Sequence, residues 1–390
     1  MGARICCIEK KDIGGTCLNK GCIPTKYLIV CVDKLRKAKG LVDMGPALEG
    51  KLVWKKMLTG KNRVVATQAK GIEGLFKSWG VTLLRGHASF SDRTTLLVNG
   101  EGKSPQEVKA QRVIIATGSS PMSIPGVECD GASVLNSDHI FDLEEPPESL
   151  LIIGAGAIGC EFACLFQELG CQVTIVEMMP RPLPLEDEEI SGIFTRELKK
   201  KQIALYTGFK VASLQKRNGR VWVRLDDGTE IGAHKALVVT GRRKNTAGLG
   251  LERIGLTDIQ VNEMMETETT GIYAAGDVVG KKMLAHVASR EGVVAMENAL
   301  GNPMGMDYRV VPSTIFTDPE IASVGLTEEQ ARKERGNVII GRFPFRALGK
   351  AHVLGEIAGE VKIVAGGQNE EILGAHIIGC LLYTSDAADE

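Results

Sequence analysis

Residues 150–159 of the 390-residue chain read LLIIGAGAIG, a short apolar run followed by the pattern G-x-G-x-x-G. The apolar run is typical of a buried strand in a parallel sheet, and residues 161–169 then carry apolar side chains at helical spacing. A second apolar run ends in Glu177, 18 residues after the last glycine of the pattern. A lone G-x-G-x-x-G is a weak signal, but a strand, glycine turn, helix and acid in this order form a dinucleotide-binding fingerprint.

The fingerprint also predicts which dinucleotide is bound. Its glycines, Gly154, Gly156 and Gly159, let the backbone approach a pyrophosphate at the N-terminus of the following helix. Glu177 can accept hydrogen bonds from a ribose 2′-hydroxyl and would repel a 2′-phosphate. We therefore expect this unit to bind NAD rather than NADP. A glycine turn that binds nothing is the alternative, and the complete strand, turn and helix context disfavours it.

The chain contains two pairs of stretches with similar sequences, which we call echoes. Residues 2–9 (GARICCIE) align without a gap with residues 170–177 (GCQVTIVE), and residues 112–118 (RVIIATG) resemble residues 235–241 (KALVVTG). Two paired echoes predict two homologous nucleotide-binding domains, each with a buried strand that ends in an acid. By the same alignment, we expect the first strand, glycine loop and helix of the N-terminal unit, at least about 19 residues, to precede Met1 in a longer parent protein.

A pair of closely spaced cysteines lies in residues 14–26, GGTCLNKGCIPTK. A disulfide needs Cα atoms about 4.4–6.8 Å apart, whereas five residues of regular α-helix rise about 7.5 Å, so Cys17 and Cys22 can bridge only where the backbone departs from a helix. Gly21 can supply that departure because glycine tolerates unusual backbone angles, and Pro24 suits the first turn of a following helix. The alternatives are a structural disulfide or half of a zinc site, but the other cysteines are scattered and offer no second pair. We favour a redox-active pair.

The cysteine motif resembles the active-site signature of the FAD-dependent pyridine-nucleotide disulfide oxidoreductases, and within them that of the dihydrolipoyl dehydrogenases. The resemblance extends to about Gly379. It implies an α/β fold with two Rossmann-like nucleotide-binding domains, for FAD and NAD, and an incomplete C-terminal α+β dimerisation domain. The boundaries that it implies are an FAD-binding domain at 1–146, an NAD-binding domain at 147–266, a return to the FAD or central domain at 267–308, and a dimerisation domain at 309–379. We expect a strand at 78–85 in the first of these domains, and strands at 361–364 and 372–378 in the last. Residues 380–390 do not resemble the family, and we interpret them as a non-native tail.

The resemblance also implies roles for individual residues. Cys17 and Cys22 would form the catalytic disulfide, and Lys26 would lie near the flavin N5 edge, paired with Glu161. Alone, Asp277 could equally be a helix cap and Lys26 a surface residue. No role is assigned to Arg242 and Arg243, because Lys244 stands where the family has proline. The implied FAD contacts are Glu9, Gly15, Thr16, Lys26, Gly86, Thr117, Gly118, Asp277 and Ala285. The implied NAD contacts are Gly154, Gly156, Ile158, Gly159, Glu161, Glu177 and Gly241.

The implied reaction is oxidation of protein-bound dihydrolipoamide, with NAD⁺ as the final electron acceptor. A substrate thiolate would attack Cys17, Cys22 would leave as a thiolate, and the electrons would pass through FAD. The implied partners are a second copy of the chain and the lipoyl domain of a 2-oxoacid dehydrogenase or glycine cleavage complex. Glutathione and mercuric reductases share the cysteine ring but generally prefer NADP, which disfavours them here. A non-catalytic NAD-binding module is the alternative of a different class.

The family's catalytic base is a histidine in a His-Pro-x-x-x-Glu segment. None of the six histidines of this sequence is followed by proline. Acid–base help is typically worth about 10²–10⁴-fold in rate, so we expect this 390-residue chain to be nearly inactive with dihydrolipoamide.

The composition excludes several other functions. The formal net charge is −1, which predicts no general attraction to nucleic acid, and no apolar run approaches the roughly 18 residues that a membrane span needs. The ten cysteines lack the spacing of a small disulfide framework, and a lone close pair in such a chain is more often catalytic. We expect no bound metal and a reducing compartment, cytoplasm or mitochondrial matrix.

Overall fold

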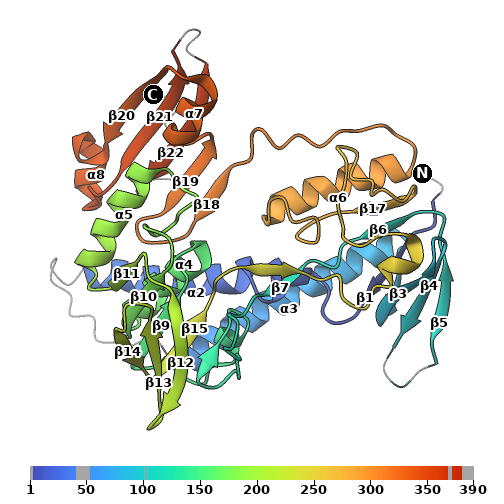
Figure 1. Cartoon of the computed structure of the whole chain (residues 1–390), viewed down its shortest axis with the longest axis horizontal. Helices are drawn as coiled ribbons and strands as arrows, with labels where there is room; N and C mark the ends of the chain where they lie inside the picture. Colours follow the sequence, from blue (N-terminus) through green and yellow to red (C-terminus); the bar gives the residue numbers. More distant parts are fainter. Residues whose placement is uncertain (1–2, 41–52, 101, 103, 368–370, 380–390) are drawn as a thin grey trace. The chain divides into compact units, whose positions relative to one another are not determined.

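The computed structural model describes residues 3–40, 53–100, 102, 104–367 and 371–379, so the expected tail at 380–390 lies outside the described residues. The chain divides into two compact units, each assembled from three stretches of sequence (Figure 1). The first unit comprises Met1–Thr25, Thr59–Ser120 and Arg242–Tyr308, and the second comprises Lys26–Leu58, Pro121–Gly241 and Arg309–Glu390.

The second unit contains a five-stranded parallel sheet. Its strand order is β11-β10-β9-β15-β8, and every neighbouring pair is parallel. The predicted strand at 150–153 is confirmed as the central strand of this sheet. The order reverses at β9, and ligands of open parallel sheets bind at such a switch point, beyond the carboxyl ends of the strands. The strands are β8 (Val134–Leu135), β9 (Ser149–Ile153), β10 (Gln172–Glu177), β11 (Ala204–Thr207) and β15 (Lys235–Val238).

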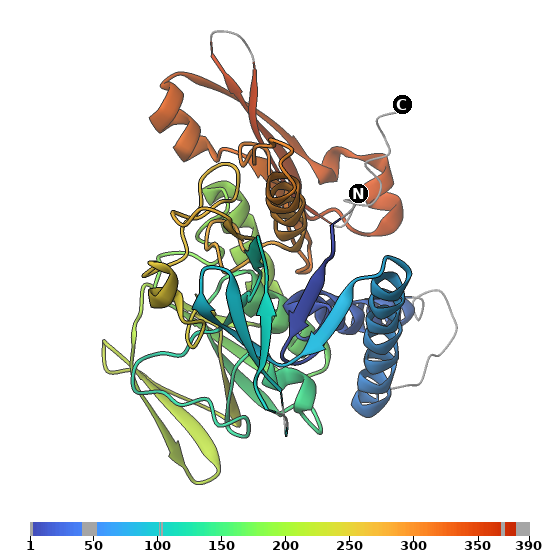
Figure 2. The same cartoon turned by 90° about the vertical axis from the view of Figure 1, so that its right-hand side faces the viewer.

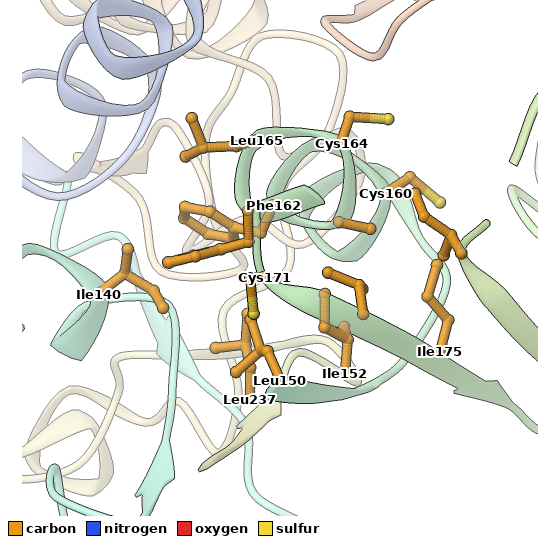
Figure 3. Close-up of a cluster of buried hydrophobic side chains, with 14 of the residues drawn as sticks. Ile140, Leu150, Ile152, Cys160, Phe162, Cys164, Leu165, Cys171, Ile175 and Leu237 are labelled. Atoms are coloured by element: carbon orange, nitrogen blue, oxygen red, sulfur yellow. The ribbon is translucent and has the colours of Figure 1, made fainter. Parts of the chain in front are cut away.

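Helix α4 (Ala157–Glu168) covers one face of this sheet. Figure 3 shows Phe162 and Leu165 of α4 in one cluster with Leu150 and Ile152 of β9, and all four are at most 2% exposed. The helix begins four residues before the predicted start at residue 161. Its first turn includes the last glycine of the fingerprint, which has no side chain to show an apolar spacing.

An antiparallel region and a second sheet complete this unit. β12 (Val211–Arg217), β13 (Arg220–Leu225) and β14 (Glu230–Ala233) form an antiparallel meander between β11 and β15 in the chain. The C-terminal sheet has the order β18-β19-β22-β21-β20 and is antiparallel throughout (orange to red in Figures 1 and 2). Its strands are β18 (Ser313–Ile315), β19 (Ile321–Gly325), β20 (Val338–Pro344), β21 (Glu360–Gly366) and β22 (Ile372–Ile378). The predicted strands at 361–364 and 372–378 are confirmed.

The remaining helices of the second unit are short apart from α2. α5 (Glu188–Lys200) is capped by the Asp187 side chain, and α7 (Glu328–Arg335) begins with a capping box formed by Thr327 and Gln330. The others are α8 (Gly349–Leu354), η2 (His139–Asp142) and η4 (Phe345–Ala347). α2 (Cys22–Gly40) contributes Leu28 and Val32 to the core around α4.

The first unit contains two separate pairs of parallel strands. β1 (Cys6–Glu9) pairs with β2 (Thr82–Arg85), and β6 (Val113–Ile115) pairs with β17 (Ile272–Ala274). An antiparallel sheet of β3 (His87–Asp92), β4 (Thr95–Asn99) and β5 (Gln106–Lys109) follows β2. The other elements are α1 (Gly15–Asn19), α6 (Ala285–Ala299), η3 (Leu251–Ile254), β7 (Ser119–Pro121) and β16 (Arg242–Lys244).

Two expectations about this unit are wrong. The strand expected to be fully buried, β1, has an exposed Cys6 and otherwise half-buried residues, because within the described residues β1 pairs with β2 alone. The strand expected at 78–85 begins only at Thr82, because α3 (Trp54–Ser78) continues to residue 78. Helix α3 was not expected, and its first turns place Trp54 and Met57 in the core of the second unit.

Candidate active site

The cysteine motif folds as two helices with a break between them. Cys17 lies in α1, Cys22 is the first residue of α2, and both are half-buried. The predicted departure from a regular helix is confirmed, and Pro24 lies in the first turn of α2 as expected. A Cβ atom on Gly21 would lie 3.0 Å from Thr16 O and 3.4 Å from Cys17 Cα. The chain just before Cys22 therefore packs directly against the backbone of Cys17.

The reason for a glycine at residue 21 differs from the predicted one. Its φ angle is not in the left-handed region that favours glycine, whereas Gly14 and Gly15, just before α1, have φ of +102° and +62°. Gly21 is needed for the close approach of the two helices, and the unusual backbone angles lie at the entrance to the motif.

Lys26 and Glu161 form the predicted pair. Lys26 Nζ donates to both Glu161 carboxylate oxygens at 2.8 Å and lies 4.6 Å from the centre of the Phe316 ring. The Phe316 backbone N–H donates to Glu161 Oε1 at 3.0 Å. The side chain of Glu161 is 7% exposed and that of Lys26 is 28% exposed. The ammonium group of Lys26 is thus held by a carboxylate and an aromatic face.

The three fingerprint glycines meet different surroundings. A Cβ atom on Gly154, where φ is +110°, would lie 2.5 Å from Val239 O, and one on Gly159 would lie 2.0 Å from Gly154 O. A Cβ atom on Gly156 would meet nothing within 4 Å. The first and third glycines therefore serve the turn and the packing of α4 on β15, while the second leaves open space at the N-terminus of α4. This is the arrangement that a pyrophosphate needs, so the residues present fit a dinucleotide.

The carboxylate of Glu177 accepts hydrogen bonds from the backbone of the same glycine loop and of the residues after β10. Its Oε2 accepts a hydrogen bond from the Ala155 N–H at 2.6 Å and its Oε1 accepts one from the Met179 N–H at 2.8 Å. The residue is 7% exposed. A carboxylate has about four acceptor positions, so these two bonds leave capacity for ribose hydroxyls.

The other predicted NAD residues are spread around this loop. Ile158, in the first turn of α4, is partly buried and packs against the hydrophobic core. Gly241 has a φ of +142°, and its carbonyl accepts a hydrogen bond from Met122 N–H at 3.0 Å. It lies two residues beyond Val239, whose carbonyl faces Gly154. Glu161 lies in α4, but its carboxylate is engaged by Lys26 and Phe316.

In the first unit, the ends of β6 and β17 bring three predicted FAD residues together. Ala274 pairs with Ile115, and Ala275 N–H donates to Ile115 O at 3.0 Å. Thr117 and Gly118 follow β6, and Asp277 follows β17. The Ser119 hydroxyl donates a short hydrogen bond to Asp277 Oδ2. Gly118 has a φ of +69°, and a Cβ atom there would meet nothing within 4 Å.

Arg242 contacts both Ser119 and Asp277, although we predicted no role for it from the sequence. Its Nε donates to Ser119 Oγ at 2.7 Å, its Nη2 donates to Ser119 O at 2.9 Å, and its Nε lies 3.6 Å from Asp277 Oδ2. Because Ser119 and Arg242 are far apart in sequence, no local spacing could have revealed this contact.

The remaining predicted FAD residues lie in other parts of the first unit. Glu9 ends β1, and its carbonyl accepts a hydrogen bond from Gly86 N–H at 3.0 Å, so these two residues adjoin each other. A Cβ atom on Gly86 would lie 2.7 Å from Asn99 O. Gly15 and Thr16 open α1, and Ala285 is the first residue of α6. Glu9 is the last residue of β1 in one two-stranded sheet, and Asp277 follows β17, a strand of another.

Membrane-spanning helices and metal-binding clusters are both absent from the part of the chain that the structure describes. No helix there has the length and apolar character to cross a lipid bilayer. No three side chains of His, Cys, Asp or Glu there gather in a way that could hold a metal ion.

Comparison with known proteins places the chain in a family. Residues 1–292 match the family profile described as pyridine nucleotide-disulphide oxidoreductase, and residues 311–382 match the dimerisation domain of the same family. The chain therefore belongs to the pyridine nucleotide-disulphide oxidoreductases. The predicted family and fold class are confirmed.

Particular relatives share most of this chain. It is 41% identical to a dihydrolipoyl dehydrogenase of Bacillus subtilis, over 97% of this chain and 84% of that protein. It is 40% identical to the dihydrolipoyl dehydrogenase of Thermus scotoductus, over 97% and 83%. Among solved structures, LpdA of Mycobacterium tuberculosis matches with a TM-score of 0.91 and 28% identity, covering all of this chain and 88% of that one. The Escherichia coli flavoprotein disulfide reductase RclA matches with a TM-score of 0.87 and 25% identity, over 99% and 87%.

Proposed function

We propose that this chain is a dihydrolipoyl dehydrogenase, which oxidises protein-bound dihydrolipoamide and reduces NAD⁺ to NADH. The low activity expected without a His-Pro-x-x-x-Glu base concerns the rate of this reaction and not its chemistry. The observation that carries the proposal is the placement of Cys17 and Cys22 across a helix break whose two sides pack together at Gly21. The chain around it is 41% identical to a dihydrolipoyl dehydrogenase over nearly its whole length. The cofactors are FAD and NAD.

The two cysteines carry the exchange with the substrate. A thiolate of the substrate attacks Cys17 Sγ, the Cys17–Cys22 bond breaks, and Cys22 leaves as a thiolate. The second substrate thiol then displaces Cys17, so the substrate becomes a disulfide and the two cysteines become thiols. When bound, FAD would supply the electron transfer from these two thiols to NAD⁺. Lys26 lies one helical turn after Cys22 in α2, and a positive charge at that position would favour the thiolate form of Cys22.

The cofactor contacts are assigned as follows. For NAD, the open position at Gly156 and the carboxylate of Glu177 would receive the pyrophosphate and the adenosine ribose. Ile158, Gly159 and Gly241 would contribute backbone. For FAD, Asp277 would bind the ribityl chain, and the open left-handed glycines Gly15 and Gly118 would allow close approach. The further FAD contacts would be Glu9, Thr16, Lys26, Gly86, Thr117 and Ala285.

Partner and compartment belong to the same proposal. The family's dimerisation domain is present, and the partner subunit would be a second copy of this chain. The substrate would arrive on the lipoyl domain of a 2-oxoacid dehydrogenase or glycine cleavage complex, in the cytoplasm.

The proposal is tested by the chemistry of the cysteines rather than by turnover alone. Purified chain should carry a flavin absorbance spectrum. Peptide mass spectrometry without reductant should find Cys17 linked to Cys22. Anaerobic dihydrolipoamide should then make both residues available to a thiol-alkylating reagent. Cys22→Ser should abolish the linked peptide, whereas Cys6→Ser, at an exposed cysteine of β1, should leave it intact. A chain that shows no such linkage and binds no flavin would contradict the proposed function.

A further inference from the structure

Glu291 is a buried acid to which the proposed reaction gives no role. It lies on the inner face of α6 in the first unit and is 0% exposed. Burying a carboxylate is costly unless hydrogen bonds replace the lost water. Glu291 has two such bonds. Its Oε2 accepts one from the Gly276 backbone N–H at 2.7 Å, and its Oε1 accepts one from the Tyr308 hydroxyl at 2.6 Å.

The surroundings of Glu291 do not supply a partner of opposite charge at bonding distance. Within the residues that the structure describes, no lysine or arginine forms an ion pair with it. Burial raises the pKa of Glu291, while the hydrogen bonds from Tyr308 and Gly276 and the more distant Lys281 act against the shift and Asp277 adds to it. Lys281 lies over the Tyr308 ring, 4.8 Å from its centre. The carboxylate is therefore held mainly by the two hydrogen bonds.

The hydrogen bond from Gly276 N–H to Glu291 stabilises a turn that needs a left-handed backbone angle. Gly276 has a φ of +79°, in the left-handed region, and immediately precedes Asp277. A Cβ atom on Gly276 would lie 3.4 Å from the Cβ of Ala288, so the turn packs directly on the first turns of α6. Ala285, a predicted FAD contact, begins that same helix. Glu291 thus ties together two segments, the turn with Asp277 and the N-terminal half of α6, that both carry proposed flavin contacts.

We propose that Glu291 is a positioning residue for the flavin site. Its carboxylate fixes the Gly276 N–H and so aims Asp277 at the ribityl chain, while the Tyr308 hydroxyl holds the carboxylate in place. This inference rests on the proposed function, because it takes Asp277 to be an FAD contact. It adds a residue that touches neither the cofactor nor the substrate.

The test compares variants of the full chain at Glu291. Glu291→Leu removes both hydrogen bonds. Glu291→Gln keeps an oxygen to accept from Gly276 N–H and an amide to donate to the Tyr308 oxygen. Tyr308→Phe removes the second bond alone. Glu297→Gln, a charge-removing change on the same helix at a carboxylate that accepts a hydrogen bond from Asn302, is the matched control.

Two measurements separate positioning from general stability. The first is FAD affinity, from flavin fluorescence titrations. The second is hydrogen exchange of the Gly276 amide in protein without FAD. We expect Glu291→Leu to weaken FAD binding about tenfold or more, since a hydrogen bond to a buried charge is lost, and to accelerate exchange at Gly276. Glu291→Gln should recover most of both properties, and Glu297→Gln should change neither.

The failures of the two proposals are distinguishable. If the unmodified chain does not bind FAD, the proposed function is wrong and the role of Glu291 falls with it. If the unmodified chain binds FAD and a folded Glu291→Leu variant, with NAD affinity unchanged, binds it equally well, the positioning role alone is overturned. Equal losses in the Leu, Gln and Glu297→Gln variants would also overturn it, because they would reflect charge or stability rather than the bond to Gly276.

Discussion

At the scale of single residues, the three glycines of the fingerprint perform different tasks. Gly154 and Gly159 have chain atoms within 2.5 Å of where a Cβ would lie, whereas Gly156 has none within 4 Å. The φ of Gly156 is −73°, which alanine adopts without strain. The residue type is the same in all three places, but the cost of replacing it should differ.

We therefore predict opposite phenotypes for two alanine substitutions. Gly156→Ala should fold with a free energy of unfolding within about 1 kcal/mol of the unmodified chain, but should bind NAD at least tenfold more weakly because the new methyl group fills the open position. Gly159→Ala should lower the free energy of unfolding by about 1–3 kcal/mol or more, because it forces α4 away from Gly154. Calorimetric NAD titration and urea unfolding would check both. Normal NAD affinity in Gly156→Ala would remove this position from the site.

The local features of the site were predictable from the sequence, whereas the contacts between residues far apart in the chain were not. The glycine turn, Glu177 and the helix break at the cysteines follow from residues close together in the chain. Arg242 and Glu291 could not be recognised in this way. Arg242 acts through Ser119, 123 residues away in sequence, and Glu291 looks like any acid of a helix until its burial is known.

At the scale of elements, one lysine joins helices of the second unit to its C-terminal sheet. Lys362 of β21 has a side chain that is 3% exposed, and its Nζ lies 2.8 Å from Asp187, 3.1 Å from Glu189 and 2.8 Å from Glu328. Asp187 caps α5, and it also accepts a hydrogen bond from the Glu328 N–H at the start of α7. Burial would raise the pKa of Asp187, but the hydrogen bonds from Lys362 and Glu328 leave that pKa below its ordinary value.

Removing this ammonium should be far more damaging than removing an exposed one. Lys362→Met leaves the buried carboxylate of Asp187 without its charged partner and should lower the free energy of unfolding by about 3–5 kcal/mol. Arg342→Met, at a 42%-exposed side chain that pairs with Glu189, should cost at most about 1 kcal/mol. Urea unfolding of both variants at pH 7 is the measurement. Equal losses would show that the cluster does not stabilise the junction of α5, α7 and β21.

The element boundaries show why some secondary structure was predictable and some was not. The strands β9 and β22 were predictable because each is a short apolar run in the sequence. The first turn of α4 was missed because glycine and alanine carry little periodic signal. The strand expected at 78–85 was too long because residues 78–81 have no strong local preference, and α3 extends to Ser78.

At the scale of the whole molecule, acids from distant parts of the second unit gather around Glu320. Burial, followed by the nearby charge of Asp33 and then those of Asp318 and Glu356, raises the pKa of Glu320 to about 7, while Lys37 opposes the shift. The pKa of this carboxyl in the folded chain is thus above its value of 4.5 in the unfolded chain. Folding then favours the protonated form, and the stability that it provides is lost as the pH rises from about 4.5 through about 7.

Replacing this acid should remove that dependence on pH. We expect Glu320→Gln to have a higher melting temperature than the unmodified chain at pH 8, because the amide carries no charge to be repelled by its neighbours. The difference should fade toward pH 4.5, where the acid is protonated in the folded chain and half protonated in the unfolded chain. Melting curves between pH 4.5 and 8 would measure it, with Glu334→Gln in α7 as an exposed control. A constant difference across this range would contradict the assignment.

At this scale, the internal repeat was the feature that the sequence made visible. The two echoes of strand and Thr-Gly turn correspond to β1 with β10 and to β6 with β15, so a repeat in the sequence became a repeat in the fold. The discontinuous composition of each unit was less accessible, because it depends on which distant segments pack together.

The burial of Lys362 has a practical consequence. Acylating reagents are attacked by the lone pair of a neutral, solvated amine, whereas this ammonium is both enclosed and held charged by three anions. Acylation of Lys362 is therefore confined to molecules in which β21 has separated from α5 and α7. The rate at which Lys362 is acylated therefore measures how often this separation occurs. Mass spectrometry can follow that rate in a mixture of proteins, without any engineered probe.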